Sequence, residues 1–270
     1  MFTKFNYSPE DNNFYVKNTF FDRGDSLYQK SQSEAKACLK KFIRNDGTIN
    51  GSELKEHWFS IKKADVFLSH SHKDLENVKC FAGWLYEEFG LTSFIDSCAW
   101  GYCDDLLRQI DDKYCRFENS STYNNSLRNY STSHVHMMLS TALTEMIDKC
   151  ECVIFYNTPN SISIASEISK QKNGDSTTLS PWIYHELSMT SMLRMNPPAR
   201  IQNVYFEHSS MGVAKSELNI KYDVEKFLKE MFILNDNTLL AWQRRHSMKD
   251  NTYIHALDYL YDVYGGIIHH

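Results

Sequence analysis

The sequence predicts an α/β protein built on a parallel sheet, and three observations support that prediction. From Ala64 onward, short apolar runs alternate with amphipathic stretches of helical periodicity. The first apolar run ends in the polar segment Ser69 to Asp74 and the second ends at Asp96, so each run leads into a polar loop. A chain of 270 residues that is 42% hydrophobic and 14% aromatic has enough apolar surface to bury one substantial core.

The middle of the chain supplies the elements of the predicted sheet. Strands are predicted at Asp65 to Ser69, Thr92 to Ile95, Cys152 to Tyr156 and Ile201 to Phe206. Helices are predicted at Leu75 to Phe89, Asp104 to Tyr114, Val135 to Asp148 and Pro181 to Arg194, with a loop at Ser97 to Gly101. A strand, a helix and a second strand in succession form a βαβ unit, which implies parallel pairing and right-handed crossovers.

Both ends of the chain are predicted to be helical additions to this core. Residues 1–61 would form an N-terminal helical extension and residues 236–270 a C-terminal one. Each is too short to bury a core of its own, so we expect both to pack on the central domain or on a second protomer. The Ser/Asn-rich insertion, residues 118–134, has few groups to bury and is predicted to be a mobile surface loop near the site.

Charge and composition argue against several classes of partner. The net charge of −5 repels a phosphate backbone, so nucleic-acid binding is not expected. No stretch approaches the ~20 apolar residues of a membrane-spanning helix, and the N-terminus lacks the apolar core of a signal peptide. The seven cysteines contain no C-x-x-C pair and are expected to be reduced, packed thiols. We therefore expect a cytoplasmic protein that does not act at a membrane.

The histidines that follow the first predicted strand allow a second interpretation. His70, His72 and Asp74 have the spacing of a zinc-hydrolase loop, in which imidazoles share one metal ion. Leu75 stands where that motif requires a further histidine, and a catalytic zinc needs about three protein ligands. We therefore expect no metal, and we favour a polar loop that receives a nucleotide at the carboxyl end of a parallel strand.

Four segments, taken in order, resemble the Toll/interleukin-1 receptor (TIR) domain. They are DVFLSHSHKD, the strand ending in FID, the strand CVIFYN and the helical segment SPWIYHEL. The residues that match the pattern of that family are Asp65, Val66, Phe67, Ser69, His70, Asp74, Asp96, Trp182, Glu186 and Leu187. The resemblance covers residues 62–235 and implies a flavodoxin-like fold, with a five-stranded parallel sheet wrapped by helices. The insertion at 118–134 and the end segments are not part of a minimal TIR domain.

The resemblance also implies a function, because one branch of the family cleaves NAD+ between nicotinamide and ribose. In that branch the glutamate of the W-x-x-x-E helix is catalytic, and Glu186 occupies its position here. A carboxylate suits this chemistry, since loss of nicotinamide leaves a ribosyl centre with oxocarbenium character. NAD+ would be the substrate, and no separate cofactor is expected.

Six further residues are predicted to contact the substrate. Ser69 and His70 would hydrogen-bond phosphate or ribose, and Asp96 would accept from a ribose hydroxyl or instead cap a turn. Trp182 lies one helical turn from Glu186 and would form a wall for the nucleotide. Trp100 and Asn157 are weaker candidates on adjacent loops.

Family analogy suggests a biological setting for this activity. The chain resembles bacterial TIR enzymes of antiphage defence, notably those of Thoeris systems, in which an ADP-ribose-derived signal activates a separate effector. That setting implies self-association through TIR domains and a phage-derived activator. The alternative is a non-enzymatic adaptor that acts only through TIR–TIR association.

Overall fold

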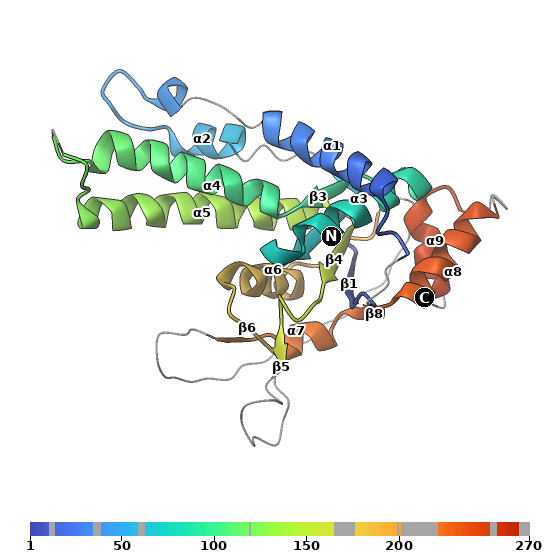
Figure 1. The fold of residues 1–270 in the computed structure, drawn as a ribbon. Coiled ribbons are helices and arrows are strands. Elements are labelled where there is room, and N and C mark those ends of the chain that lie inside the picture. Colours follow the sequence, from blue (N-terminus) through green and yellow to red (C-terminus); the bar gives the residue numbers. More distant parts are fainter. Residues whose placement is uncertain are drawn as a thin grey trace, which may run out of the picture.

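A five-stranded parallel sheet lies at the centre of the structure, a computed structural model (Figure 1). The strand order is β3-β2-β4-β1-β8, and every pairing is parallel. In that order the strands span Ser93–Ile95, Val66–His70, Cys152–Tyr156, Thr3–Tyr7 and Phe232–Leu234. The structure describes residues 1–10, 14–34, 39–58, 63–118, 120–164, 176–198, 200, 221–248 and 253–264. The prediction of an α/β fold on a five-stranded parallel sheet is confirmed.

The N-terminal segment differs from the prediction. We expected residues 1–61 to be a helical extension, but β1 is an interior strand of the sheet, paired with β4 on one side and β8 on the other. A flavodoxin-like sheet with strand order 2-1-3-4-5 takes its fourth strand from later in the chain, whereas here the N-terminus fills the position beside β4. The predicted strand at 201–206 lies outside the described residues.

The sheet is covered on both faces, and the central strands alternate accordingly. Cys152, Ile154 and Tyr156 of β4 face one apolar cluster, whereas Val153 and Phe155 face the opposite side. Strands buried on both faces appear in the sequence as continuous apolar runs. This pattern explains why the range predicted for β4 agrees with the structure.

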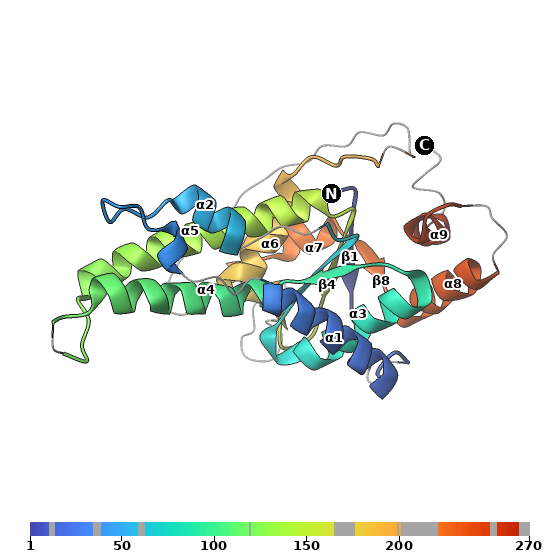
Figure 2. The same cartoon turned by 90° about the horizontal axis from the view of Figure 1, so that it is seen from above.

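The first face is covered by α3, Leu75–Phe89, together with helices from both ends of the chain. α1, Asn18–Glu34, lies along α3 in both views (Figures 1 and 2). α8, Asp236–Ser247, and α9, Ala256–Val263, contribute Trp242, Leu257, Leu260 and other side chains to the same cluster. The terminal segments therefore share the core of the sheet.

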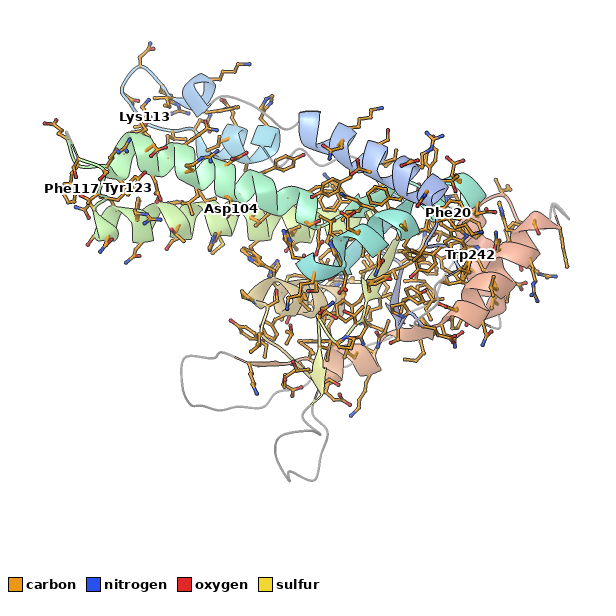
Figure 3. All side chains as sticks on the ribbon, viewed as in Figure 1. Phe20, Asp104, Lys113, Phe117, Tyr123 and Trp242 are labelled. Atoms are coloured by element: carbon orange, nitrogen blue, oxygen red, sulfur yellow. The ribbon has the colours of Figure 1, made fainter. Side chains whose placement is uncertain are left out.

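The opposite face is covered by two long helices that continue beyond the sheet as a projecting arm (Figure 1). α4, Ser97–Ile110, runs into a π-helical segment, η3, at Asp111–Cys115, and α5, Asn125–Lys149, returns beside it. Lys113, Phe117 and Tyr123 mark the tip of the arm (Figure 3). The predicted loop at Ser97–Gly101 is thus the first turn of α4, and most of the predicted mobile loop at 118–134 is helix, with its tip far from the sheet.

Shorter elements complete the described structure. η1, Leu39–Phe42, and α2, Gly51–Trp58, lie beside the arm, and η2, His72–Asp74, follows β2. α6, Pro181–Met192, and α7, Glu225–Lys229, form a further cluster with Phe155 of β4. A small antiparallel sheet joins β5, Ser163–Ile164, to β6, Ser176–Thr178, and β6 to β7, Tyr222–Asp223. No helix within the described residues is long and apolar enough to cross a membrane.

Candidate functional site

The candidate site lies where β2, β3 and β4 end, at the carboxyl edge of the parallel sheet. Open α/β sheets bind their ligands at this edge. β2 delivers Ser69 and His70 there, and Asp96 follows the last residue of β3. α6 packs against the same edge and brings Glu186 to it.

Glu186 is held in the interior by its helix and by one hydrogen bond. α6 begins with a Ser180 cap, whose hydroxyl accepts from the backbone N–H of Ile183 at 3.3 Å, and with Pro181 in the first turn. The Glu186 residue is only 1% exposed. Its Oε2 accepts a hydrogen bond from Ser69 Oγ at 2.5 Å, whereas Oε1 is buried with no partner among the described residues.

The surroundings of Glu186 oppose its negative charge. Burial raises the pKa of this carboxyl well above its ordinary value, the neighbouring Asp96 carboxyl raises it further, and the Ser69 hydrogen bond acts in the opposite direction. A buried carboxyl with a raised pKa beside a second carboxyl is a frequent arrangement in active sites. Glu186 therefore holds its proton more tightly than an exposed carboxyl does.

His70 and Asp96 form the second half of this constellation. His70 Nδ1 lies 2.5 Å from Asp96 Oδ1, and the residues are 4% and 1% exposed. The ring is not oriented for a directed hydrogen bond, so both ring nitrogens and Asp96 Oδ1 have no hydrogen-bond partner among the described residues. Asp96 precedes α4 but makes no side-chain cap with it. Buried polar atoms without partners are rare in folded proteins and indicate a functional role or a ligand.

The buried carboxylate of Asp74 connects the loop after β2 to the loop after β4 by hydrogen bonds. Asp74 accepts hydrogen bonds from Thr158 Oγ1 at 2.6 Å and from Asn160 Nδ2 at 2.7 Å. This contact holds in place the loop that carries Asn160. It also occupies the third residue of the zinc-like motif, and the structure does not gather His70, His72 and Asp74 around a common point.

A pocket of about 490 Å³ opens at this edge, within the range of roughly 300–1,000 Å³ typical of small-molecule sites. Its lining comes from the carboxyl edge, the middle of α4, the loop after β4, β5, β6 and the start of α6. The lining residues are His70, Ser71, His72, Asp96, Asp104, Asn160, Ser161, Ser163, Thr178, Leu179, Ser180 and Ile183. Ser69 and Glu186 are not among them; both are buried, and Glu186 neighbours the lining residue Asp96.

The structure brings four of the predicted site residues together and separates two others. Ser69, His70, Asp96 and Glu186 are linked by the contacts described above. Trp182 shares α6 with Glu186 but packs toward α5, with its ring 5.4 Å from that of His136, and it does not line the pocket. Asn157 is also outside the pocket, because its amide donates to Asn6 Oδ1 of β1 at 3.0 Å.

Trp100 lies in the first turn of α4 instead of in the predicted loop, and the position of its side chain lies outside the described structure. Sequence reasoning missed the two residues on the loop after β4, Asn160 and Ser161, and it missed Asp104. For Asn160 and Ser161 a signal was present, since they follow the end of a buried strand as Asp96 does. Asp104 carries no such signal, because it lies two turns inside α4 and does not directly follow a strand.

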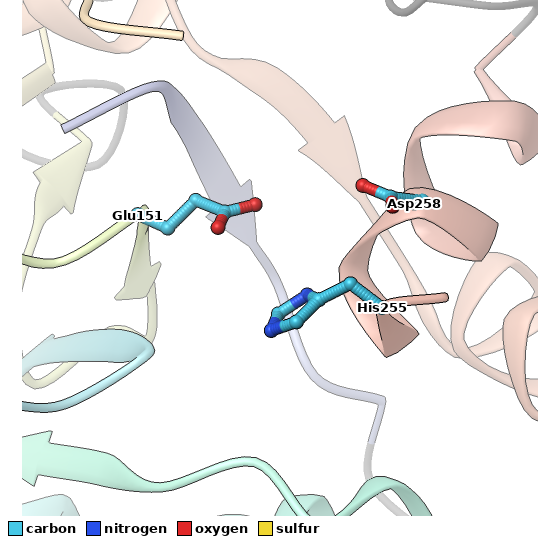
Figure 4. A group of neighbouring side chains, drawn as sticks. All are labelled: Glu151, His255 and Asp258. Atoms are coloured by element: carbon cyan, nitrogen blue, oxygen red, sulfur yellow. The ribbon is translucent and has the colours of Figure 1, made fainter. Parts of the chain in front are cut away.

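A second group of chemically capable side chains lies elsewhere, where β4 begins beside α9 (Figure 4). Glu151, His255 and Asp258 have the proximity of a metal site. The guanidinium of Arg200 is already hydrogen-bonded to both carboxylates, to Glu151 at 2.8 Å and to Asp258 at 2.7–2.9 Å. His255 Nδ1 accepts from the N–H of Leu257 at 3.3 Å. This group is therefore an ion-pair network that joins α9 to the sheet.

Comparisons of the chain with family models, with curated proteins and with solved structures gave no match. The geometry of the site is therefore the basis for a functional conclusion.

Proposed function

We propose that the protein cleaves the bond between nicotinamide and ribose in NAD+, with Glu186 as its catalytic carboxylate. The observation that supports this most strongly is the meeting of Glu186, Ser69, His70 and Asp96 beside a nucleotide-sized pocket at the carboxyl edge of the sheet. The resemblance of the strand and helix motifs to NAD-cleaving TIR domains points to the same chemistry.

The reaction balances with water as the only co-reactant. The electron pair of the C1′–N1 bond leaves with nicotinamide and neutralises the positive charge of its ring. Water adds to C1′ and releases one proton, so NAD+ and water give ADP-ribose, nicotinamide and H+. An internal hydroxyl or ring nitrogen of the ADP-ribose portion replaces water if the product is cyclic. Glu186 would stabilise the positive charge that develops at C1′.

This role requires the ionised form of Glu186, whereas the pKa of the buried carboxyl is raised in the protein alone. A cationic substrate resolves the conflict, because an opposite charge nearby favours the charged form of an acid. Ser69 supports ionisation further through its hydrogen bond to Oε2. The carboxyl is buried and does not line the pocket, so the proposal also requires the neighbouring lining residues to move and expose Oε1 when substrate binds.

The wider setting belongs to the same proposal. A product derived from ADP-ribose would act as a signal in antiphage defence of the Thoeris type, with a phage component as activator and a separate effector as the target. Self-association through the TIR-like domain would accompany activity.

The proposal is tested by incubating the purified protein with NAD+ in 18O-labelled water, with and without lysate from phage-infected cells. We expect free nicotinamide by chromatography. Mass spectrometry would show 18O in the ribose product if the reaction is hydrolysis and no label if it is cyclisation. Absence of nicotinamide under both conditions would contradict the enzymatic proposal and favour the adaptor alternative.

A further inference from the structure

The charge of the pocket identifies the part of the substrate that it suits. Two carboxylates line it: Asp96 at its buried end and Asp104 on the exposed surface of α4. Among the described residues that line the pocket there is no lysine and no arginine. Like charges repel at close range, so this lining disfavours a pyrophosphate and favours a cation.

The buried end of the pocket contains polar side chains whose hydrogen-bonding capacity is not fully used. His70 Nε2 is buried, lies on a lining residue and has no hydrogen-bond partner among the described residues, and Asp96 Oδ1 lies 2.5 Å from Nδ1 of the same ring. Leaving such atoms unpaired costs free energy, which a ligand that bonds to them recovers. An imidazole and a carboxylate side by side suit a ribose hydroxyl, which both donates and accepts hydrogen bonds.

The remaining residues that line the pocket combine apolar and polar side chains, which suits a flat aromatic ring with a polar substituent. Leu179 and Ile183 provide apolar surface, and Asn160 and Ser161 provide amide and hydroxyl groups on the facing loop. Ligand sites typically combine an apolar wall with a few polar groups that fix orientation. A pyridinium ring that bears a carboxamide has this combination of an apolar body, a positive charge and a polar substituent.

We propose that this pocket binds the cationic ribosylpyridinium end of the substrate and that its recognition does not require the diphosphate. The inference rests on the proposed function and specifies its substrate class as N-ribosylpyridinium compounds. Nicotinamide riboside, which carries the ring cation and the ribose but no phosphate, then binds as a minimal ligand. Its reduced dihydropyridine form, which has the same shape but no charge, binds more weakly.

The test measures binding directly by calorimetry, in the Glu186→Gln protein, so that turnover does not interfere. The two ligands are nicotinamide riboside and dihydronicotinamide riboside. Asp104→Asn removes the exposed carboxylate of the pocket. Asp105→Asn is the matched control, because it makes the same change one residue along α4, at a side chain that pairs with Arg108 at 2.6 Å and does not line the pocket.

We expect Asp104→Asn to weaken binding of nicotinamide riboside by about two- to fivefold, the size typical of an exposed charge pair. The loss should shrink as salt is raised, because screening acts on exposed charges. Binding of the dihydro form should not change, and Asp105→Asn should leave both affinities unaltered.

Three results would overturn the inference. Equal affinity for the charged and uncharged ribosides would remove the cation preference, and an unaltered affinity in Asp104→Asn would remove the carboxylate from recognition. Cleavage of NAD+ by the wild-type protein, combined with no binding of nicotinamide riboside, would show that the diphosphate is required while leaving the proposed function intact. Failure of the proposed function itself appears separately, as absence of nicotinamide release from NAD+.

Discussion

Glu186 is a buried acid whose neighbours keep its proton, and this has a consequence for stability. The folded protein binds a proton at this carboxyl more tightly than the unfolded chain, because burial and Asp96 raise its pKa. Between the ordinary pKa of about 4.3 and the raised value, folding takes up a proton, so the stability from this group falls as pH rises through that window. Above the raised pKa, both states are ionised and the loss is complete.

Replacing Glu186 by glutamine should therefore make the free energy of unfolding depend less strongly on pH. The amide resembles the protonated acid in shape and cannot ionise, so the variant should gain stability relative to wild type as pH rises above the ordinary glutamate pKa of about 4.3. Urea unfolding at several pH values measures this difference. Glu118→Gln, at an exposed position near the tip of the arm, is the control. Its free energy of unfolding should depend on pH in the same way as that of the wild type. Parallel curves for Glu186→Gln would contradict the raised pKa.

At the scale of elements, α1 and α3 cross so closely that each needs a glycine at the crossing. A Cβ placed on Gly83 would lie 1.9 Å from the carbonyl oxygen of Phe20, and one placed on Gly24 would lie 1.9 Å from that of Lys79. These neighbours are backbone atoms that cannot rotate away. The buried Lys79 ammonium adds an ion pair to Asp25 at 2.9 Å across the same contact.

Gly83→Ala should consequently lower the free energy of unfolding by about 1–3 kcal/mol or more, as overpacked sites do. Gly101→Ala is the matched control, because it lies in α4 with no atom within 4 Å of its added Cβ. There alanine should stabilise the protein by roughly 0.5–1 kcal/mol through its higher helix propensity. Urea denaturation measures the free energy of unfolding of both variants. Equal changes for Gly83→Ala and Gly101→Ala would contradict the close approach of α1 and α3.

The projecting arm depends on the N-terminus of α5, which lies in a Ser/Asn-rich segment that is typical of a loop. Asn124 caps α5, and its Oδ1 accepts from the N–H groups of Ser126 and Leu127 at 3.0 and 3.2 Å. Asn124→Ala should weaken the start of α5 by about 0.5–2 kcal/mol, and hydrogen exchange of its first turns should accelerate. Asn129→Ala, within the same helix and exposed, should not accelerate it. Rapid hydrogen exchange throughout 125–134 in the wild type would contradict the helix and support the predicted mobile loop.

Particular elements show how far the sequence predicts this fold. α3 and β4 agree with their predicted ranges because their apolar residues are strongly patterned and buried. The start of α5 differs from the prediction because its Ser/Asn-rich composition is typical of a loop, whereas a projecting helix needs only one apolar face. β1 was missed because Lys4 and Asn6 make it look polar, although Lys4 pairs with Glu230 at 2.8 Å and Asn6 is buried.

The same contrast holds within the site. Glu186, Ser69, His70 and Asp96 were predicted to share one site because strand ends and a helix motif carry them to the same edge. Trp182 packs outside the pocket although it lies one turn from Glu186, because spacing along a helix fixes the relative directions of two side chains only roughly. Glu186 accepts a hydrogen bond from Ser69, while Trp182 packs on α5. The direction in which a helix packs is decided by tertiary contacts.

At the scale of the whole molecule, the two ends of the chain meet in one core. Tyr7 of β1 donates a hydrogen bond to Asp236 of α8 at 2.6 Å, and its hydroxyl also lies 3.0 Å from that of Tyr15. Tyr15 in turn contacts Tyr156 of β4 at 2.8 Å. This buried network joins the first strand, the central strand and a C-terminal helix.

Tyr7→Phe should lower the free energy of unfolding by about 1–3 kcal/mol, because it leaves the buried Asp236 without this donor. The control is Tyr130→Phe, at a residue that is 67% exposed, which should change stability by less than about 0.5 kcal/mol. Thermal unfolding of both variants measures the difference. Similar values for the two would show that the network contributes nothing beyond packing.

We propose that Glu186 supplies the negative charge needed to break the nicotinamide–ribose bond of NAD+. The most direct test is the rate of nicotinamide release from saturating NAD+ by the wild-type protein, Glu186→Gln and the control Glu118→Gln. We predict that Glu186→Gln loses a factor of roughly 10²–10³ or more, as for removal of one well-placed electrostatic group, while Glu118→Gln keeps the wild-type rate. Wild-type turnover in a folded Glu186→Gln protein would contradict the account.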